Sequence, residues 1–307
     1  MVACPSEELL GAVVDGRYTL TGLLGRGGFG AVFRAEDRDG PSCAIKLIPF
    51  VHWTERALAQ REASLLEEHA HPGLVAFHRA GRFGPTARGF VYIAMELGAG
   101  SLDDRLRSHG VLHAGEIRAL IFDLLDALDH LHARGVVHGD VKPGNLVRVA
   151  GRFKLCDLGS AMDTGSRADR DGFRSGTPEI AAPEVWDGEI GPPADLWSLG
   201  LLLHTAATGR SPFPMPSADP EPIARVVRTT EPRIDPALPE PFAAIVRGCL
   251  QRDQAARWTS AEVRAALEAV DLAPPAPPPR HRMKLPAMAL AGCYKVAARA
   301  REIFTRW

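Results

Sequence analysis

The residues best suited to chemistry lie in one short stretch of the chain. It begins His138-Gly139-Asp140-Val141-Lys142-Pro143-Gly144-Asn145 and reaches Asp157-Leu158-Gly159 twelve residues later. Asp140 can orient and deprotonate a hydroxyl group, and Lys142 can neutralise a phosphoryl group during its transfer. Asn145 and Asp157 supply hard oxygen ligands of the kind that Mg²⁺ prefers. Four complementary roles so close together favour a phosphoryl-transfer site over a solvated loop that gathered such residues by chance.

A glycine-rich segment lies upstream, between two β-type runs: Gly25-Arg26-Gly27-Gly28-Phe29-Gly30. Glycine lets a backbone approach phosphate groups closely, because no side chain stands in the way. A tight hairpin or a dinucleotide site would also produce this pattern. A dinucleotide site opens a helix, however, whereas residues 31–34 (AVFR) continue as a strand. The segment therefore predicts a hairpin over a nucleotide, with contacts from Gly25, Gly27, Gly28, Phe29 and Gly30.

Lysine is rare in this chain, which uses arginine 31 times and lysine five times. A lysine that persists in such a composition is expected to be needed, and Lys46 lies in a strand-like run, residues 43–48 (CAIKLI). Its ammonium offers a compact charge to phosphate oxygens, whereas an ordinary edge-strand lysine would extend to water. Glu62, sixteen positions later on a predicted helix, is the expected partner of Lys46. Glu55, Glu67 and Glu68 are the alternatives.

The hydrophobic pattern predicts an α+β scaffold for these residues. Residues 18–48 alternate β-type runs with glycine-rich turns, which indicates an antiparallel meander. A helix at about 54–68 and strands near 74–79 and 90–95 complete a small sheet-plus-helix unit. The remainder is predicted to be mostly helical, with one apolar stripe along residues 114–134. Further helical patterns lie near 194–208, 242–251 and 260–270.

Six motifs in order resemble those of the eukaryotic-type (Hanks-type) serine/threonine protein kinase family. They are GRGGFGAV, CAIK, HGDVKPGN, DLG, Ala182-Pro183-Glu184 and the segment DLWSLG that starts at Asp195. The resemblance covers about residues 16–270. It implies a bilobal fold, with a small antiparallel β-sheet lobe that carries one helix and a larger, mostly α-helical lobe. It also implies ATP and Mg²⁺ as cofactors, with Mn²⁺ as an alternative ion, and transfer of the γ-phosphoryl group to protein hydroxyls.

The resemblance assigns roles to individual residues as well. Lys46 and Glu62 join Asp140 and Lys142 as catalytic residues. Thr177, in a Gly-Thr-Pro-Glu segment, is similar to the threonine that bonds the catalytic Asp and Lys in serine/threonine-directed members. The other implied positions are Met95 as gatekeeper; Glu96, Leu97 and Gly98 as the hinge for adenine; Val32, Ala44 and Val147 around the adenine ring; His138, Leu158 and Leu66 in the regulatory spine; and Glu184, Arg257 and Asp195 as structural residues, with Glu184 paired to Arg257.

Two positions depart from the family pattern. Leu158 replaces the usual phenylalanine, which is an apolar exchange. Gly139 replaces the arginine that normally receives a phosphorylated activation loop. We therefore expect activity that does not depend strictly on loop phosphorylation. Arg167, Arg170 and Arg174 lie nearby in the sequence and could still surround a phosphate.

Two other functions remain open at this stage. Small-molecule kinases of the aminoglycoside and choline type also carry His-Gly-Asp before the catalytic loop. Lys142, the Ala-Pro-Glu segment and the long activation segment, residues 157–184, favour protein substrates instead. A pseudokinase scaffold is the second alternative, but no catalytic position is missing from the sequence.

Composition and charge exclude several classes of protein. A net charge of −1 over 307 residues offers no basic field for nucleic acid, so no nucleic-acid partner is expected. The five cysteines are widely spaced, which predicts neither a zinc site nor a disulfide framework. The N-terminus lacks the pattern of a secretion signal, and no apolar run reaches the roughly 20 residues of a membrane span. We expect a cytoplasmic signalling kinase, and the high Ala, Arg, Gly and Pro content suggests a bacterial source.

The C-terminal end differs in charge from the rest of the chain. Residues 280–307 hold seven Lys or Arg and one acidic residue. We predict an N-terminal extension (1–15), an N-lobe (16–96), a C-lobe (97–270), a proline-rich linker (271–286) and a basic amphipathic helix (287–307). This helix could attach to an anionic membrane, dock on the chain's own lobes or on a partner, or serve no binding role. Peripheral membrane association through residues 280–307 is therefore one expectation among three.

Overall fold

The computed structural model describes residues 7–27, 30–50, 53–84, 89–166, 177–214 and 220–269. All of these residues belong to one compact unit, Met1–Asp271. The predicted proline-rich linker and basic helix, residues 271–307, lie outside the described residues, as do Gly28 and Phe29. Within the described residues, no helix is long and apolar enough to cross a membrane.

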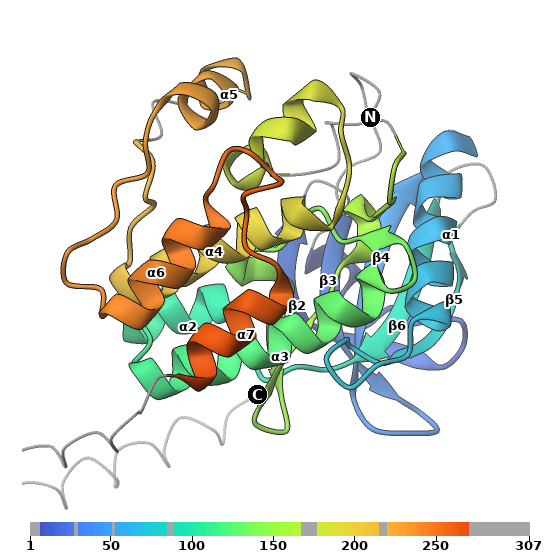
Figure 1. Cartoon of the computed structure of the whole chain (residues 1–307). Helices are drawn as coiled ribbons and strands as arrows, with labels where there is room; N and C mark the ends of the chain where they lie inside the picture. The colour runs from blue at the N-terminus through green and yellow to red at the C-terminus, as the bar shows by residue number, and fades with distance from the viewer. Residues whose placement is uncertain are drawn as a thin grey trace, which may run out of the picture. The chain divides into compact units, whose positions relative to one another are not determined.

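The N-terminal part is a six-stranded sheet with the strand order β1-β2-β3-β4-β6-β5. Every neighbouring pair in it is antiparallel. Figure 1 shows this sheet on one side of the unit, with α1 beside it and the other helices gathered on the opposite side. The strands are β1 (Val13–Val14), β2 (Tyr18–Gly27), β3 (Gly30–Asp37), β4 (Cys43–Phe50), β5 (Phe77–Phe83) and β6 (Gly89–Glu96).

Strand β4 explains how the sheet positions its lysine. Cys43, Ile45 and Leu47 pack in one hydrophobic cluster, whereas Ala44 and Ile48 belong to the larger core of the protein. Because side chains alternate along a strand, Lys46 shares the face of Ala44 and Ile48. The same core includes Ala59, Ala63 and Leu66 of helix α1 (Trp53–Glu68). Lys46 therefore faces the side of the sheet on which α1 packs.

The C-terminal part is helical, and its elements are α2 (Leu102–His109), α3 (Ala114–His132), α4 (Pro192–Thr208), α5 (Pro220–Thr229), α6 (Glu240–Cys249) and α7 (Ser260–Glu268). The apolar stripe predicted along residues 114–134 is buried in α3. Helix α4 is buried on nearly all sides, so its composition is apolar all round. The predicted bilobal α+β kinase-like fold is confirmed.

Two short antiparallel strand pairs lie between α3 and α4. They are β7 (Val136–Val137) with β10 (Met162–Asp163), and β8 (Leu146–Val149) with β9 (Arg152–Leu155). The loop 138–145 runs from β7 to β8 and ends in the short 3₁₀ turn η2 (Pro143–Asn145). The second 3₁₀ turn, η3 (Leu158–Ser160), follows β9. These four short strands hold both motif segments of the 138–159 stretch.

Some elements differ from the sequence-based expectation. The strand expected near 74–79 begins at Phe77 and continues to Phe83, whereas Leu74 forms an isolated parallel bridge with Leu155. Leu74 is buried, so its apolar character serves this contact and not the sheet. Helix α2, helix α5 and the edge strand β1 were not expected. Ser101 and Asp104 form a capping box that fixes the start of α2.

Candidate active site

The loop that follows β7 is hydrogen-bonded to a buried carboxylate of α4, Asp195. Asp195 is fully buried and accepts hydrogen bonds from the backbone amides of His138 and Gly139, each at 2.9 Å. It also lies 2.7 Å from Nε2 of His132. Burial alone would raise the pKa of Asp195, but the bond to His132 and the loop amides hold it below its usual value. The Asp195 carboxylate thus stays ionised and fixes the backbone that precedes Asp140.

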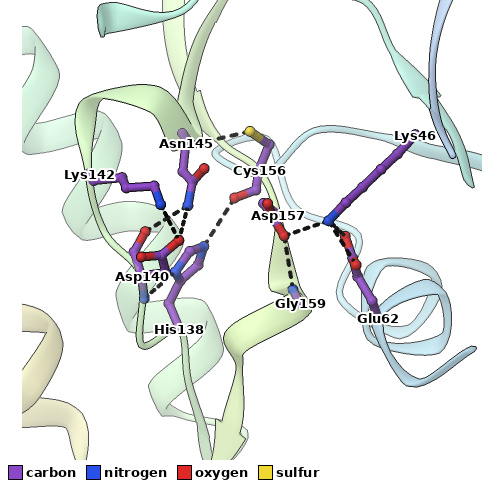
Figure 2. Close-up of polar contacts among 9 residues, drawn as sticks. All are labelled: Lys46, Glu62, His138, Asp140, Lys142, Asn145, Cys156, Asp157 and Gly159. Carbon is purple, nitrogen blue, oxygen red and sulfur yellow. Dashed lines mark hydrogen bonds and ion pairs between the residues drawn. The ribbon is translucent and has the colours of Figure 1, made fainter. Parts of the chain in front are cut away.

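Asp140 lies at the centre of a polar cluster in this loop (Figure 2). Its Oδ2 accepts a hydrogen bond from Nδ2 of Asn145 and pairs with Nζ of Lys142, both at 2.8 Å. Lys142 Nζ also donates to Oγ1 of Thr177 at 2.6 Å. Asp140 Oδ1 is buried and has no hydrogen-bond partner among the described residues. One oxygen is therefore fixed by neighbours, and the other is free to accept a proton or a ligand.

His138 connects this loop to the segment that carries Asp157. Its Nδ1 accepts a hydrogen bond from the Asp140 amide at 3.2 Å, so the ring hydrogen is on Nε2, which lies 3.2 Å from the carbonyl of Cys156. Asn145 makes a second link, because its carbonyl accepts from the backbone amide of Cys156 at 2.9 Å. These bonds bring Asn145 and Asp157 to the same place, although they are twelve residues apart.

Lys46 binds two carboxylates, one from each part of the protein. Its Nζ lies 2.7 and 2.9 Å from the two carboxylate oxygens of Glu62 on α1, and 2.8 Å from Oδ1 of Asp157. Glu67 and Glu68, two alternatives, are exposed. The side chain of Glu55, the third, is outside the described residues. Glu62 is thus the partner of Lys46 among the described glutamates of α1.

The pKa values of Lys46, Glu62 and Asp157 depend on one another, because one ammonium pairs with two carboxylates. Burial raises the pKa of Glu62 to about 7, and this effect outweighs the attraction of Lys46. Burial would also raise the pKa of Asp157, but Lys46 and the Gly159 amide hold it below its usual value. The pKa of Lys46 is raised, because two carboxylates outweigh its burial. The trio therefore keeps Asp157 ionised and lets Glu62 take up a proton near neutral pH.

The donor set of this site fits a divalent cation. Asn145 Nδ2 is used by Asp140, which leaves its carbonyl oxygen Oδ1 as an oxygen donor. Lys46 and the Gly159 amide both bind the Asp157 carboxylate through Oδ1. Mg²⁺ is usually held by one or two carboxylates together with phosphate oxygens of the substrate, so these residues suit it.

The glycine-rich segment supplies Gly25 and Gly27 at the end of β2 and Gly30 at the start of β3. Gly30 has a φ of +142°, and a Cβ atom there would lie only 2.1 Å from the carbonyl oxygen of Leu47. Only glycine fits this close approach of β3 to β4. The hairpin therefore needs a glycine at position 30 for a reason of backbone packing.

The hinge candidates connect the sheet to the helical part. Ala44 of β4 lies between two strand neighbours, Arg34 of β3 and the gatekeeper candidate Met95 of β6. At Gly98 a Cβ atom would lie 2.8 Å from Cβ of Val147, so the hinge backbone runs directly against β8. The remaining adenine candidates, Val32 on β3 and Leu97 in the hinge, are both partly buried against the main core.

Several structural residues also come together. Arg257 binds both carboxylate oxygens of Glu184 at 2.5 and 2.9 Å, and its guanidinium lies over the Trp197 ring at 5.2 Å. Leu66 of α1 and Leu158 of η3 belong to one hydrophobic core.

Three polar contacts were not anticipated from the sequence. Lys154 of β9 pairs with the hinge residue Glu96 at 2.7 Å, and His132 pairs with Asp195. Arg61 of α1 reaches the carbonyl of Ala161. A signal existed for Lys154, which is one of the few lysines of an arginine-rich chain. The contacts of His132 and Arg61 depend on long-range packing and carry no local signal.

Known proteins resemble this chain over most of its described part. Residues 18–267 match the family model described as the protein kinase domain. The putative CBL-interacting protein kinase 27 of Oryza sativa subsp. japonica is 37% identical over 213 residues, which is 66% of this chain and 51% of that protein. The probable serine/threonine-protein kinase PkwA of Thermomonospora curvata is 33% identical over 268 residues, 86% of this chain and 35% of that protein.

A third relative is the serine/threonine-protein kinase pkn3 of Myxococcus xanthus. It is 32% identical over 293 residues, which is 87% of this chain and 52% of that protein. The chain thus spans about half, or less, of the length of these curated relatives.

Proposed function

Because the chain belongs to the protein kinase family, we propose that it transfers the γ-phosphoryl group of ATP to serine or threonine hydroxyls of protein substrates. The observation that carries this proposal is the state of Asp140. Its Oδ2 is held by Lys142 and Asn145, whereas its buried Oδ1 has no partner in the part of the chain that the structure describes. A carboxylate with one fixed and one free oxygen is suited to orient a hydroxyl group and accept its proton.

The chain's own residues divide the work of the reaction. Asp140 Oδ1 accepts the proton of the attacking hydroxyl group. Lys142 places a positive charge beside the Asp140 carboxylate. Lys46 binds phosphate oxygens, and Glu62 holds its ammonium in place. A divalent cation, Mg²⁺ or alternatively Mn²⁺, held by Asn145 and Asp157, would neutralise charge on the phosphate groups. Gly25, Gly27 and Gly30 allow the backbone to cover the nucleotide.

The contact of Thr177 supports serine or threonine as the acceptor. Its hydroxyl accepts a 2.6 Å hydrogen bond from Lys142, which also pairs with Asp140. The segment around Thr177 is thereby drawn close to the catalytic carboxylate. Thr177 is similar in this contact to the threonine that bonds the catalytic Asp and Lys in serine/threonine-directed members of the family, and this similarity supports a serine or threonine acceptor.

A labelled-ATP assay tests the proposal against its two rivals. We expect label from γ-labelled ATP to enter generic protein substrates, and Asp140→Asn to reduce this by about 10²–10⁴-fold, the usual contribution of a general base. Asp140→Asn keeps the size of the side chain, so a loss of transfer in this variant reports on the missing carboxylate. Label that enters aminoglycosides or choline but not protein would instead select a small-molecule kinase. Nucleotide binding without any transfer would select a scaffold.

The C-terminal end supports a separate proposal, which concerns residues outside the described part. We propose that residues 280–307, which carry seven basic residues and one acidic residue, bind an anionic membrane surface. The intact chain should sediment with vesicles that contain phosphatidylserine, and a chain that ends at residue 279 should not. Equal sedimentation of both chains would contradict membrane binding.

A further inference from the structure

Three histidines gather where the chain leaves α1 and lies against α3. Two of them belong to residues 69–76, which we call the joint segment. The rings of His71 and His130 stack at 4.6 Å with 29° between their planes, and the rings of His69 and His130 meet almost perpendicularly at 5.7 Å. His69 is buried, and the other two are partly buried. The active-site contacts described above involve none of these three rings.

The hydrogen bond of His71 requires a neutral ring. Its Nδ1 accepts from the backbone amide of Gly73 at 3.1 Å, so the single hydrogen of the neutral imidazole is on Nε2. A second proton would bind at Nδ1, where the hydrogen of the Gly73 amide already points. Protonation of His71 therefore replaces this hydrogen bond by two donors that face each other.

His130 also accepts through Nδ1. This nitrogen lies 3.2 Å from Nη1 of Arg134, and guanidinium nitrogens only donate, so the hydrogen of the neutral ring is on Nε2. The same Nη1 donates to the His130 carbonyl at 3.1 Å, which keeps the guanidinium next to the ring. A proton on Nδ1 of His130 would thus face a permanent cation.

Two further ring nitrogens of the cluster are buried. They are Nδ1 of His69 and Nε2 of His130, and neither has a hydrogen-bond partner in the part of the chain that the structure describes. A charged imidazole carries two N–H groups that both need acceptors, and burying a charge without such partners is costly. The cluster is therefore built to hold neutral rings.

The charges around His71 come from α3, from its C-terminal end and from β9. Burial lowers the pKa of His71; Asp126 of α3 opposes this effect, and Arg152 and Arg134 add to it. The Asp126 carboxylate is itself paired with Arg152 at 3.3 Å and with Arg264 of α7 at 3.0 Å. Its attraction for a proton on His71 is weakened accordingly.

The charges around His130 act in the same direction. Burial lowers the pKa of His130, and Arg134 and the other two histidines lower it further. The adjacent carboxylate of Asp129 pairs with Arg264 of α7 at 2.9 Å. Both partly buried histidines of the cluster thus resist protonation while the joint segment stays in place.

The joint segment holds the sheet, the hinge and α3 together. A Cβ atom at Gly73 would lie 3.1 Å from Cβ of Ala127, so the segment packs directly on α3. The carbonyl of Gly73 accepts from the Leu155 amide of β9 at 2.8 Å. The carbonyl of Ala76 accepts from the amide of the hinge residue Glu96 at 2.9 Å. Movement of the segment away from α3 would therefore also move the hinge.

We propose that His69, His71 and His130 form a proton sensor, in which proton uptake below about pH 6.5 releases the joint segment from α3 and lowers kinase activity. The effect on activity rests on the kinase function proposed above, whereas the release of the segment does not. Protonation removes the bond from Gly73 and places a charge beside Arg134. The released segment no longer fixes the hinge, so the adenine candidates lose their position.

The direction of the response follows from proton binding by the two forms. In the released form the imidazoles are hydrated and distant from Arg134, so they bind protons more strongly than in the closed form. The equilibrium therefore shifts toward the released form as pH falls, by up to about tenfold per pH unit for each histidine that is protonated only on release. Well above pH 6.5 the rings are neutral in both forms, and this equilibrium does not respond to pH through them.

Two substitutions remove the titration and keep the local shape. His130→Phe keeps an aromatic ring for stacking, and His71→Asn keeps an acceptor for the Gly73 amide. His78→Phe is the matched control, because His78 is an exposed histidine of β5 outside the cluster.

Hydrogen exchange of the Gly73 and Leu155 amides measures the release without catalysis. Protection factors, which correct for the intrinsic effect of pH on exchange, are compared at pH 7.5 and 6.0. We expect them to fall by about tenfold in the wild type and in His78→Phe, but by less than about threefold in the double variant His71→Asn/His130→Phe.

Protein phosphorylation is measured at the same two pH values. The acid loss of rate should be about fivefold larger in the wild type than in the double variant. Asp140 and Glu62 titrate in both proteins, so the ratio of the two losses isolates the histidine cluster. NMR titration of the His130 ring adds a direct readout, and its pKa should lie below the usual value in the wild type and rise in His71→Asn.

The outcomes separate the sensor from the proposed function. Protection that falls equally in the wild type and in the double variant would overturn the sensor, and so would a wild-type His130 pKa at or above the usual value. If the double variant does not fold at pH 7.5, the single variants and the wild-type titration decide in the same way. If the wild type phosphorylates no protein at any pH, the proposed function fails, and the exchange data still show whether protons release the segment.

Discussion

Replacing Lys46 by methionine is expected to destabilise the protein by an amount that grows with pH above about 7. Lys46 is 5% exposed and Glu62 is 3% exposed, and Nζ lies 2.7 Å from Glu62 and 2.8 Å from Asp157. Removing one partner of a buried ion pair costs about 3–5 kcal/mol while the other partner stays charged. Glu62 can avoid this cost by binding a proton, because burial already raises its pKa to about 7.

The direction of this pH dependence follows from the number of protons that the folded and the unfolded chain bind. In Lys46→Met the pKa of Glu62 rises further, since the attracting ammonium is gone. Above pH 7 the folded variant keeps a proton that its unfolded chain has released, so its stability falls as pH rises. With a pKa of about 7, Glu62 of the folded wild type is about half protonated at pH 7 and almost fully ionised by pH 8.5, so the wild type loses much less stability than the variant in this window. The difference in the free energy of unfolding between the wild type and Lys46→Met should therefore grow by up to about 1.4 kcal/mol per pH unit, or about 2 kcal/mol between pH 7 and 8.5.

Urea unfolding followed by tryptophan fluorescence at pH 6.5, 7.5 and 8.5 measures this effect. The control is Lys46→Met in a Glu62→Gln background, where no carboxyl group titrates at position 62. The free-energy difference relative to Glu62→Gln alone should then change much less with pH, because Asp157 is the remaining carboxyl group in contact with Lys46. A deficit of Lys46→Met that stays constant from pH 6.5 to 8.5, or that grows equally in the control, would refute the reasoning.

Three further predictions concern the structural residues. Glu184→Gln should lower the free energy of unfolding by about 3 kcal/mol, because it leaves the buried guanidinium of Arg257 without its charge partner; a urea midpoint equal to that of the wild type would contradict this. Gly30→Ala should lower the melting temperature and weaken nucleotide binding, since the new Cβ collides with the Leu47 carbonyl, and wild-type values for both would contradict the close approach. Burial raises the pKa of the Cys156 thiol to about 12, so peptide mapping after brief alkylation at pH 8 should find it modified about 10³-fold more slowly than a free cysteine, and rapid labelling in the folded protein would count against it.

The sequence predicts the site well where its signals are local. Asp140, Lys142 and Asn145 lie within six residues of each other, so one loop brings them together. The alternation along β4 places Lys46 on the face of α1 without any knowledge of distant contacts. The choice of Glu62 over Glu67 and Glu68 needs the helix to be positioned on the sheet, because the three residues differ only in which side of α1 they occupy.

The contacts that the sequence could not predict join residues far apart in the chain. Arg61 is 100 residues from Ala161, and Lys154 is 58 residues from Glu96. Periodicity and motif spacing report on neighbours within one element, and neither records which elements pack together. Helix α2 was missed for a different reason. Its Ser101–Asp104 capping box is a local signal, but the helix has only eight residues and a mostly polar composition.

Side chains from the sheet and from the helical part are expected to form a single site for metal-bound ATP. Calorimetric titration of the wild type and of Asp157→Asn with ATP, each with and without Mg²⁺, tests this directly. We expect the wild type to bind one ATP much more tightly when Mg²⁺ is present, and Asp157→Asn to lose that enhancement while it remains folded. Folded wild-type protein that takes up no ATP in the presence of Mg²⁺ would contradict the account.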